Sequence, residues 1–315
     1  GEGRKIMKNR KHMQRLSCIL ALCIWALLGT ALFGQTVATI LGTVKDESGA
    51  VLPGVSVQVK SVETGALRTV VSDEAGRYRV PQLAVGSYDV QAELPGFQTA
   101  VRSGIILTIG REALVDFALK VGQVTESVTV SGDAPLVETT NASVGALVDE
   151  LKIRALPING RDYAALALLQ PGVVEAVNSS RGLGFTGSGL KMSISGTRPT
   201  QTIFMIDGML LTNGFGFAPG SASGIQAGVD ALREFQVLTN SFGAEYGRAA
   251  GGIINAVSRS GSNTWHGSVF EFLRNSALDS KNYFDKPDTP IPAFIRNQFG
   301  ATFGGPIKKD KTFFF

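Results

Sequence analysis

The stretch that decides the fold is Ala244–Val257, AEYGRAAGGIINAV, which a short polar turn joins to Trp265–Phe272, WHGSVFEF. In the first segment paired glycines lead into a short apolar run, which indicates a turn that feeds a strand. The second segment alternates its faces, as a half-buried strand does. A glycine-rich, tightly turned region therefore gives way to regular strands near residue 260.

The N-terminus has the features of a secretory signal. Basic residues precede an uncharged apolar run at 16–33, and small residues follow it. We predict a signal peptide over residues 1–34, with cleavage possible as late as residue 38. An uncleaved membrane anchor is the alternative, because the run approaches the length that spans a bilayer. Both cysteines, Cys18 and Cys23, fall inside this run, so the mature chain should contain no disulfide and no Cys-based metal site.

Removal of the signal changes the charge of the chain. Residues 1–34 hold 6 of the 30 Lys and Arg and 1 of the 26 Asp and Glu, which leaves 24 against 25. A near-neutral chain gives no reason to expect a nucleic-acid partner. His266 is the one histidine left, whereas a zinc hydrolase or a Ser–His nucleophile needs further positioned groups. We expect no enzymatic activity, no metal and no cofactor.

Residues 39–120 read as a small β domain. Val55, Val57 and Val59 alternate with polar residues, and glycine-containing turns separate short segments of this kind. Short strands at this spacing predict a sandwich of two sheets.

The same segment resembles carboxypeptidase regulatory-like domains. The resemblance is carried by LGTV at 41–44, PGVSV at 53–57, GRY at 76–78, GSY at 86–88 and GF at 96–97. It implies a transthyretin-like, seven-stranded sandwich of the kind grouped with carbohydrate-binding-like folds. A glycan-binding module is therefore one alternative for this part of the chain.

Residues 145–260 combine a helical pattern with many glycines. Leu151, Ile153 and Leu156 fall at helical spacing, and Pro171-Gly172 ends the pattern that follows them. The later glycines predict loops folded tightly around short strands. GLGFTG at 182–187 matches G-x-G-x-x-G, but no βαβ unit surrounds it, so we set nucleotide binding aside.

Several motifs in this region resemble, in order, the plug of TonB-dependent outer-membrane receptors. They are LPINGRD at 156–162, typical of the Oar-like branch, SISGTR at 193–198, IFMIDG at 203–208 and the YG…GGIINAV run at 246–257. The resemblance implies an α+β plug at 145–260 whose motif residues have structural or gating roles. Asp207-Gly208 equally fits a plain turn. These motif residues are Asn159, Gly160, Arg161, Arg198, Asp207, Gly208, Tyr246, Gly247, Gly251, Gly252 and Asn255.

Residues 121–144 are polar and rich in β-branched residues, which predicts an extended connector. TESVTV within it resembles a TonB box, a short segment that adds as a strand to the sheet edge of a partner. A plain Thr- and Val-rich linker fits the pattern equally well. The candidate TonB box is Thr125, Glu126, Ser127, Val128, Thr129 and Val130.

Residues 261–315 carry the pattern of transmembrane barrel strands. Ile295, Phe299, Ala301 and Phe303 share one face, which Asn297 interrupts, while Arg296, Gln298 and Thr302 share the other. A membrane sheet must close, and the few strands in this segment cannot close on themselves. We therefore expect the start of a truncated barrel, and a chain that is the N-terminal part of a longer protein.

The sequence predicts a mainly β protein: a small transthyretin-like sandwich, an α+β plug and the first strands of an incomplete transmembrane β-barrel. The family resemblance implies a receptor in the outer membrane with its sandwich in the periplasm. Its expected partners are a TonB-type energy-coupling protein, outer-membrane lipid and an unknown extracellular substrate, whether chelate, glycan or peptide. An outer-membrane adhesion or surface-assembly protein of the same architecture is the alternative.

Overall fold

The computed structural model describes most of the chain beyond the predicted signal. Asn159, Gly160, Arg161, Thr125 and Glu126 lie outside the described residues, as does the signal itself. Of 127–131 and 154–155 only the backbone is described. No helix among the described residues is long and apolar enough to span a membrane. The described residues are 38–122, 127–131, 144–155, 163–176, 191–212, 228–243, 246–247, 250–281, 283–284, 286 and 288–315.

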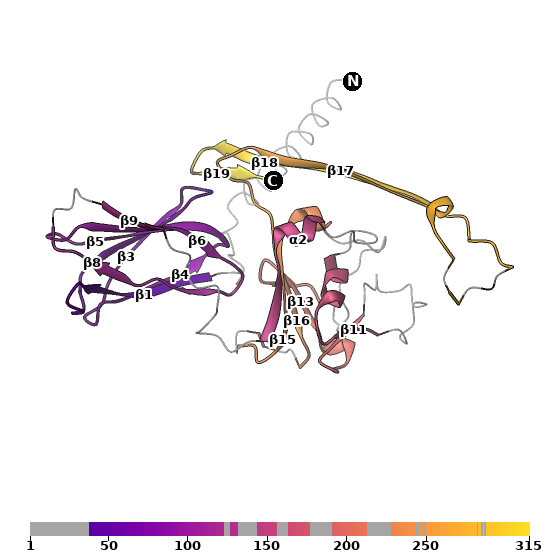
Figure 1. The fold of residues 1–315 in the computed structure, drawn as a ribbon, viewed down its shortest axis with the longest axis horizontal. Helices are drawn as coiled ribbons and strands as arrows, with labels where there is room; N and C mark the ends of the chain where they lie inside the picture. The colour runs from indigo at the N-terminus through magenta and orange to yellow at the C-terminus, as the bar shows by residue number, and fades with distance from the viewer. Residues whose placement is uncertain are drawn as a thin grey trace, which may run out of the picture. The chain divides into compact units, whose positions relative to one another are not determined.

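The first part of the chain is a sandwich of two sheets (Figure 1). One sheet has the order β4-β1-β7, with β8 also pairing with β1, and the other has the order β3-β2-β5-β6-β9. β7 and β8 pair with β1 in one continuous parallel register, so they act as a single interrupted strand. The bounds are β1 Ala38–Asp46, β2 Ser56–Ser61, β3 Leu67–Val71, β4 Arg77–Leu83, β5 Gly86–Glu93, β6 Thr99–Leu107, β7 Glu112–Leu114, β8 Phe117–Leu119 and β9 Ser127–Ser131.

The core of the sandwich follows the predicted alternation. Val55, Val57 and Val59 are fully buried, whereas the residues between them are partly exposed. Tyr78 lies in the same core and donates its hydroxyl to the carbonyl oxygen of Val115 at 2.5 Å. A buried tyrosine needs such a partner. The sandwich that the sequence predicted is thereby confirmed.

The second part, which we call the central domain, spans residues 144–258. Its sheet has the order β10-β15-β16-β13-β14, in which only β13 and β16 are parallel. β11 and β12, which come between β10 and β13 in the sequence, form a separate antiparallel pair. The bounds are β10 Val144–Val148, α2 Glu150–Ala155, η2 Tyr163–Leu169, β11 Val173–Glu175, β12 Met192–Ile194, η3 Pro199–Gln201, β13 Ile203–Ile206, β14 Met209–Leu210, η4 Val229–Ala231, β15 Leu232–Asn240 and β16 Ile253–Ser258.

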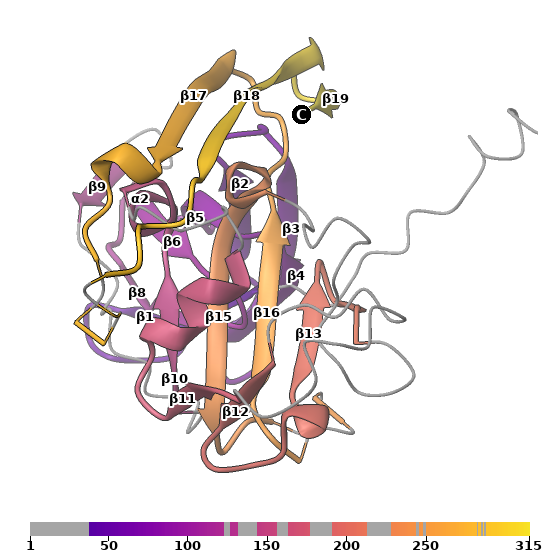
Figure 2. The same cartoon turned by 90° about the vertical axis from the view of Figure 1, so that its right-hand side faces the viewer.

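One face of the central sheet is covered by helical turns (Figure 2). Ile153 of α2 and Tyr163 of η2 belong to the same buried cluster as Phe204, Phe235 and Ile254 of the sheet. The rings of Tyr163 and Phe235 meet edge to face, with centroids 5.9 Å apart. Within the part of this stretch that the structure describes, the helical pattern that the sequence indicated appears as these two short pieces.

The third part, the C-terminal sheet, is an antiparallel sheet of β17 His266–Asn275, β18 Ile295–Lys308 and β19 Thr312–Phe314, with η5 Ser276–Leu278 after β17. β17 and β18 run side by side in unbroken register from His266↔Gly304 to Asn275↔Ile295 (Figure 1). Val269, Phe299 and Phe303 lie on one exposed face, which Asn297 interrupts as predicted and which also carries Glu271 opposite Phe299. The three described strands form an open sheet, in agreement with the predicted incomplete barrel.

Candidate functional site

The sandwich, the central domain and the C-terminal sheet belong to one unit, Gln35–Phe315. Charged and polar side chains gather where the three meet, around a cavity of about 260 Å³. We call this set the junction cluster: Glu63, Glu150, Arg233, Arg259, Ser260, Ser262, Thr264 and His266.

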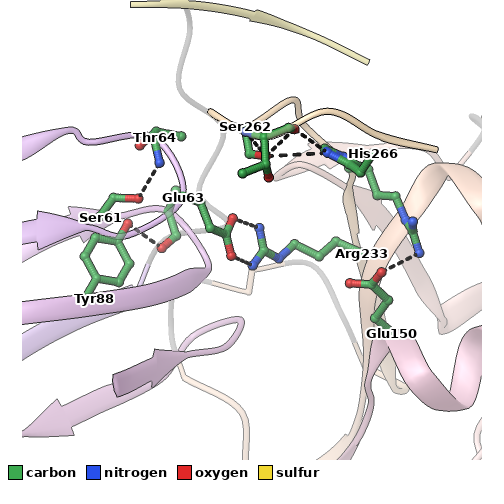
Figure 3. Close-up of polar contacts among 11 residues, drawn as sticks. Ser61, Glu63, Thr64, Tyr88, Glu150, Arg233, Ser262 and His266 are labelled. Atoms are coloured by element: carbon green, nitrogen blue, oxygen red, sulfur yellow. Dashed lines mark hydrogen bonds and ion pairs between the residues drawn. The ribbon is translucent and has the colours of Figure 1, made fainter. Parts of the chain in front are cut away.

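A bidentate ion pair joins the sandwich to the central domain (Figure 3). Glu63 lies in the turn between β2 and β3, and Arg233 is the second residue of β15. The Arg233 guanidinium donates to both carboxylate oxygens of Glu63, at 2.6 and 2.5 Å. The hydrogen bonds with Glu63 outweigh desolvation and raise the pKa of Arg233. Paired parallel bonds of this kind fix orientation as well as distance.

A second ion pair joins the central domain to the residue that directly follows it. Arg259, just after β16, is 3.0 Å from Glu150 at the start of α2 and donates from Nε to the carbonyl oxygen of Leu232 at 2.9 Å. The Arg259 side chain is only 6% exposed, so its charge depends on these partners. The pair therefore ties α2 to the residue that directly follows β16.

The segment after Arg259 carries the chain from the central domain to β17. Ser262 contacts the carbonyl oxygen and the hydroxyl of Thr264, each at 3.1 Å, and lies 3.5 Å from Nδ1 of His266. Nδ1 of His266 is also 3.0 Å from the carbonyl oxygen of Thr264. His266, the one histidine of the predicted mature chain, thus takes part in a local turn.

The β2–β3 turn of the sandwich also reaches the C-terminal sheet. The carbonyl oxygen of Glu63 accepts the N–H of Asn263 at 2.8 Å. Asn263 exchanges two hydrogen bonds with Asp310 in the β18–β19 turn, at 2.8 and 2.9 Å. Gly65 faces Asp310 so closely that a Cβ would lie 2.1 Å from its carboxylate, and its φ is +71°. One turn of the sandwich thus meets both other parts of the chain.

Glu234 forms a second contact between the sandwich and the central domain. Its side chain accepts the backbone N–H of Ile109 at 2.5 Å and is only 7% exposed. Ile109 also packs with Val85 and Val257 in a small apolar cluster. Burial raises the pKa of Glu234 to about 7, against the opposing effects of the Ile109 N–H and the Arg233 charge. Neighbouring residues of β15 thus contact the sandwich in two chemically different ways.

The structure places some of the predicted plug residues at turns and close contacts. Asp207 and Gly208 both have positive φ in the turn between β13 and β14. The Asp207 carboxylate accepts the N–H of Ser258 at 2.9 Å, so it also ties this turn to β16. Gly252 lies so close to Ile194 that a Cβ would be 2.4 Å from the side chain, and Gly251 approaches Thr197 in a similar way.

Other predicted residues have weaker structural signatures. Asn255 of β16 is fully buried opposite Gln236 of β15. Among the described residues no donor reaches Asn255 Oδ1 or Gln236 Oε1. Arg198 caps η3 without a side-chain hydrogen bond. Tyr246 and Gly247 lie in the stretch before Gly251, apart from the junction cluster.

Sequence reasoning did not find the junction cluster apart from noting His266. One signal was present: Arg233-Glu234 places two adjacent charges between the apolar Leu232 and Phe235 at the start of β15. A β-bulge between Leu232 and Glu234 interrupts the alternation of β15, and both charged side chains meet partners in the sandwich. The identity of those partners, 125 and 170 residues earlier in the chain, is not coded locally.

Comparisons with known proteins identify the parts and the family. Residues 39–120 match the carboxypeptidase regulatory-like domain, and residues 257–315 match an outer membrane beta barrel domain. The chain is also 33% identical, over 92% of its length, to the TonB-dependent transporter Oar of Myxococcus xanthus. The chain is a homologue of TonB-dependent transporters. It spans 27% of the length of Oar, about a quarter.

Further relatives of this transporter homologue have similar names. A probable TonB-dependent siderophore receptor of Acinetobacter baumannii, PirA, is 26% identical over 59% of this chain and 23% of its own length. The crystal structure of the siderophore receptor PirA is similar with a TM-score of 0.40 at 22% identity, over 55% of this chain and 24% of that one. The barrel domain and these relatives confirm the predicted outer-membrane location.

Proposed function

We propose that this chain is the N-terminal part of a TonB-dependent receptor that imports a substrate across the outer membrane. The observation that carries the proposal is the 33% identity to Oar over 92% of the chain. In this reading residues 1–34 are a signal peptide and 39–120 a periplasmic sandwich. Residues 121–144 are a connector with a TonB box, 145–260 the plug and 261–315 the beginning of the barrel.

Transport in this proposal is gating and needs no covalent catalysis. A substrate binds from outside above the plug, and a pull on the connector by a TonB-type partner loosens the plug. The substrate is a chelate, glycan or peptide; two relatives are named as siderophore or ferrienterobactin receptors, which makes a chelate the first to test.

Contacts at and near the junction cluster attach the proposed plug to the sandwich and to the C-terminal sheet. The Glu63–Arg233 pair and the Ile109–Glu234 hydrogen bond attach the sandwich to β15. The Asn263–Asp310 exchange attaches the segment after the plug to the β18–β19 turn. We propose that these contacts hold the resting plug in place and that the pull has to overcome some of them.

The plug residues named from the sequence take supporting roles in this proposal. Asp207 and Gly208 form a turn that is hydrogen-bonded to β16. Gly251 and Gly252 allow the residues just before β16 to pack closely against Thr197 and Ile194. Arg198, Tyr246 and Gly247 belong to the same motifs, as do Asn159, Gly160 and Arg161. Their part in gating is a proposal to be tested by substitution.

The test uses cells that express the full-length gene and begins with membrane fractionation. A cysteine at Val128 is then used to crosslink TonB, and a cysteine at the exposed Thr69 of β3 is the control. Outer-membrane recovery with a crosslink at Val128 alone is the expected result. Outer-membrane recovery without a crosslink, beside a working positive control, favours the adhesion or assembly alternative. Recovery in the soluble periplasm contradicts the barrel assignment.

A further inference from the structure

The candidate TonB box is already part of a sheet. β9, Ser127–Ser131, pairs in parallel with β6 of the sandwich, from Thr99↔Ser127 to Ser103↔Ser131 (Figure 1). Four of the six candidate residues, Ser127 to Val130, lie in this strand. β6 is bonded to β5 on its other side, so β9 covers what would otherwise be the edge of the sandwich.

A strand has two edges, and β6 occupies only one edge of β9. Among the described strands, none pairs with the other edge. The backbone N–H and C=O groups of alternate residues point to that open edge and can bond an added strand. Strand addition of this kind takes its affinity from main-chain hydrogen bonds.

Two routes are open to a partner that binds β9 as a strand. To use the edge that faces β6, the partner must first break the β6–β9 bonds. To use the open edge, it breaks no strand pairing among the described residues and finds β9 already extended. Because an ordered strand avoids the entropy cost of ordering a loose segment, the open edge is the more favourable of the two.

We propose that the open edge of β9 is the docking surface for the energy-coupling partner, which adds a strand there while β9 stays paired with β6. This inference rests on the proposed function, since it takes the partner to be a TonB-type protein. Its mechanical consequence is that the pull, besides acting along the connector, also enters the sandwich. From there the Glu63–Arg233 and Ile109–Glu234 contacts pass it to β15 of the plug.

The test locks β9 onto β6 and asks whether the partner still binds. Val101 and Thr129 are opposite each other in the parallel register, so Val101→Cys with Thr129→Cys places a disulfide across the two strands. A photo-crosslinking residue at Val128 reports contact with TonB in cells that express the full-length gene. Gln58→Cys with Thr69→Cys is the matched control, because it joins β2 and β3 and leaves β9 untouched.

The expected result is that oxidised and reduced forms of the Val101–Thr129 variant crosslink TonB with yields within twofold of each other. A drop to less than half on oxidation, reversed by reductant and absent from the control pair, overturns the inference, because binding then needs β9 to leave β6. If the reduced variant and the unmodified protein both fail to crosslink, the proposed TonB box itself is wrong. Disulfide formation is checked beforehand by gel mobility, which also shows that β6 and β9 are in register.

Discussion

At the scale of single residues, Glu234 is the buried group whose protonation matters most among the described residues. Its pKa of about 7 lies above the ordinary 4.5, so the folded state binds a proton more tightly than the unfolded state does. Stability from this group is therefore complete below pH 4.5 and is lost as the pH rises towards 7. The shift corresponds to at most about 3 kcal/mol.

The prediction is that Glu234→Gln removes this dependence on pH. Urea midpoints of the central domain, measured by pulse proteolysis of the full-length protein in detergent, should fall between pH 4.5 and 7 in the wild type relative to the variant. Glu74→Gln, at an exposed turn, is the control and should follow the wild type. A constant difference between wild type and Glu234→Gln across this range would show that folding does not shift the pKa of Glu234.

Gly252 is the second residue with a sharp expectation. A Cβ at this position would lie 2.4 Å from the Ile194 side chain, so Gly252→Ala forces β12 and the start of β16 apart. Overpacking of this kind typically costs about 1–3 kcal/mol. Gly247→Ala is the matched control, because a Cβ there meets no atom of the described residues within 4 Å. Equal urea midpoints for the two variants would contradict the close packing.

At the scale of elements, the Glu63–Arg233 pair joins the β2–β3 turn to β15. The two side chains are 33% and 22% exposed, so solvent weakens the pair without removing it. We predict that Glu63→Gln, Arg233→Gln and their combination give a coupling energy of about 1 kcal/mol in a double-mutant cycle. The Asp73–Arg77 pair, which is far more exposed, should give a clearly smaller coupling energy. Additive effects at Glu63 and Arg233 would mean that the junction does not hold through this contact.

Elements with a strict alternation could be predicted from the sequence. Val55, Val57 and Val59 follow a period of two that only a strand with one buried face satisfies, and the faces of β18 were assigned in the same way. The helical pattern was less reliable. Leu151 is 79% exposed and Leu169 is 63% exposed, and the two helical pieces that the structure describes here, α2 and η2, are six and seven residues long. The extent of these helices is thus set by their packing against the sheet and not by local helix propensity.

The candidate site was much less accessible to sequence reasoning than the strands were. Glu63 sits in a turn whose composition predicts a solvated loop, yet its partner is 170 residues away. The pairing of β9 with β6 was missed for the same reason, since a parallel pair needs a crossover that no local pattern encodes. The motifs named the family, whereas the contacts that join its parts came only from the fold.

At the scale of the whole molecule, the C-terminal sheet determines where the protein resides. Its two faces differ in kind: Val269 is 87% exposed on the apolar face, while the neighbouring Ser268 points to the opposite face and bonds Thr302 at 2.7 Å. In a barrel the first face meets lipid and the second meets the plug and the lumen. The apolar side chains then need no further partner within the protein.

Two arginine substitutions one residue apart test this orientation in the full-length protein. Val269→Arg places a charge against lipid and should cost about 2–4 kcal/mol near the middle of the bilayer, whereas Ser268→Arg points to the lumen side and should be tolerated far better. The measurement is the amount of folded, heat-modifiable protein in the outer-membrane fraction, which should fall strongly for Val269→Arg alone. A greater loss for Ser268→Arg would reverse the two faces. The plug would then meet the apolar side of the sheet, and the membrane would have to lie against the side that carries Arg296, Gln298 and Thr302.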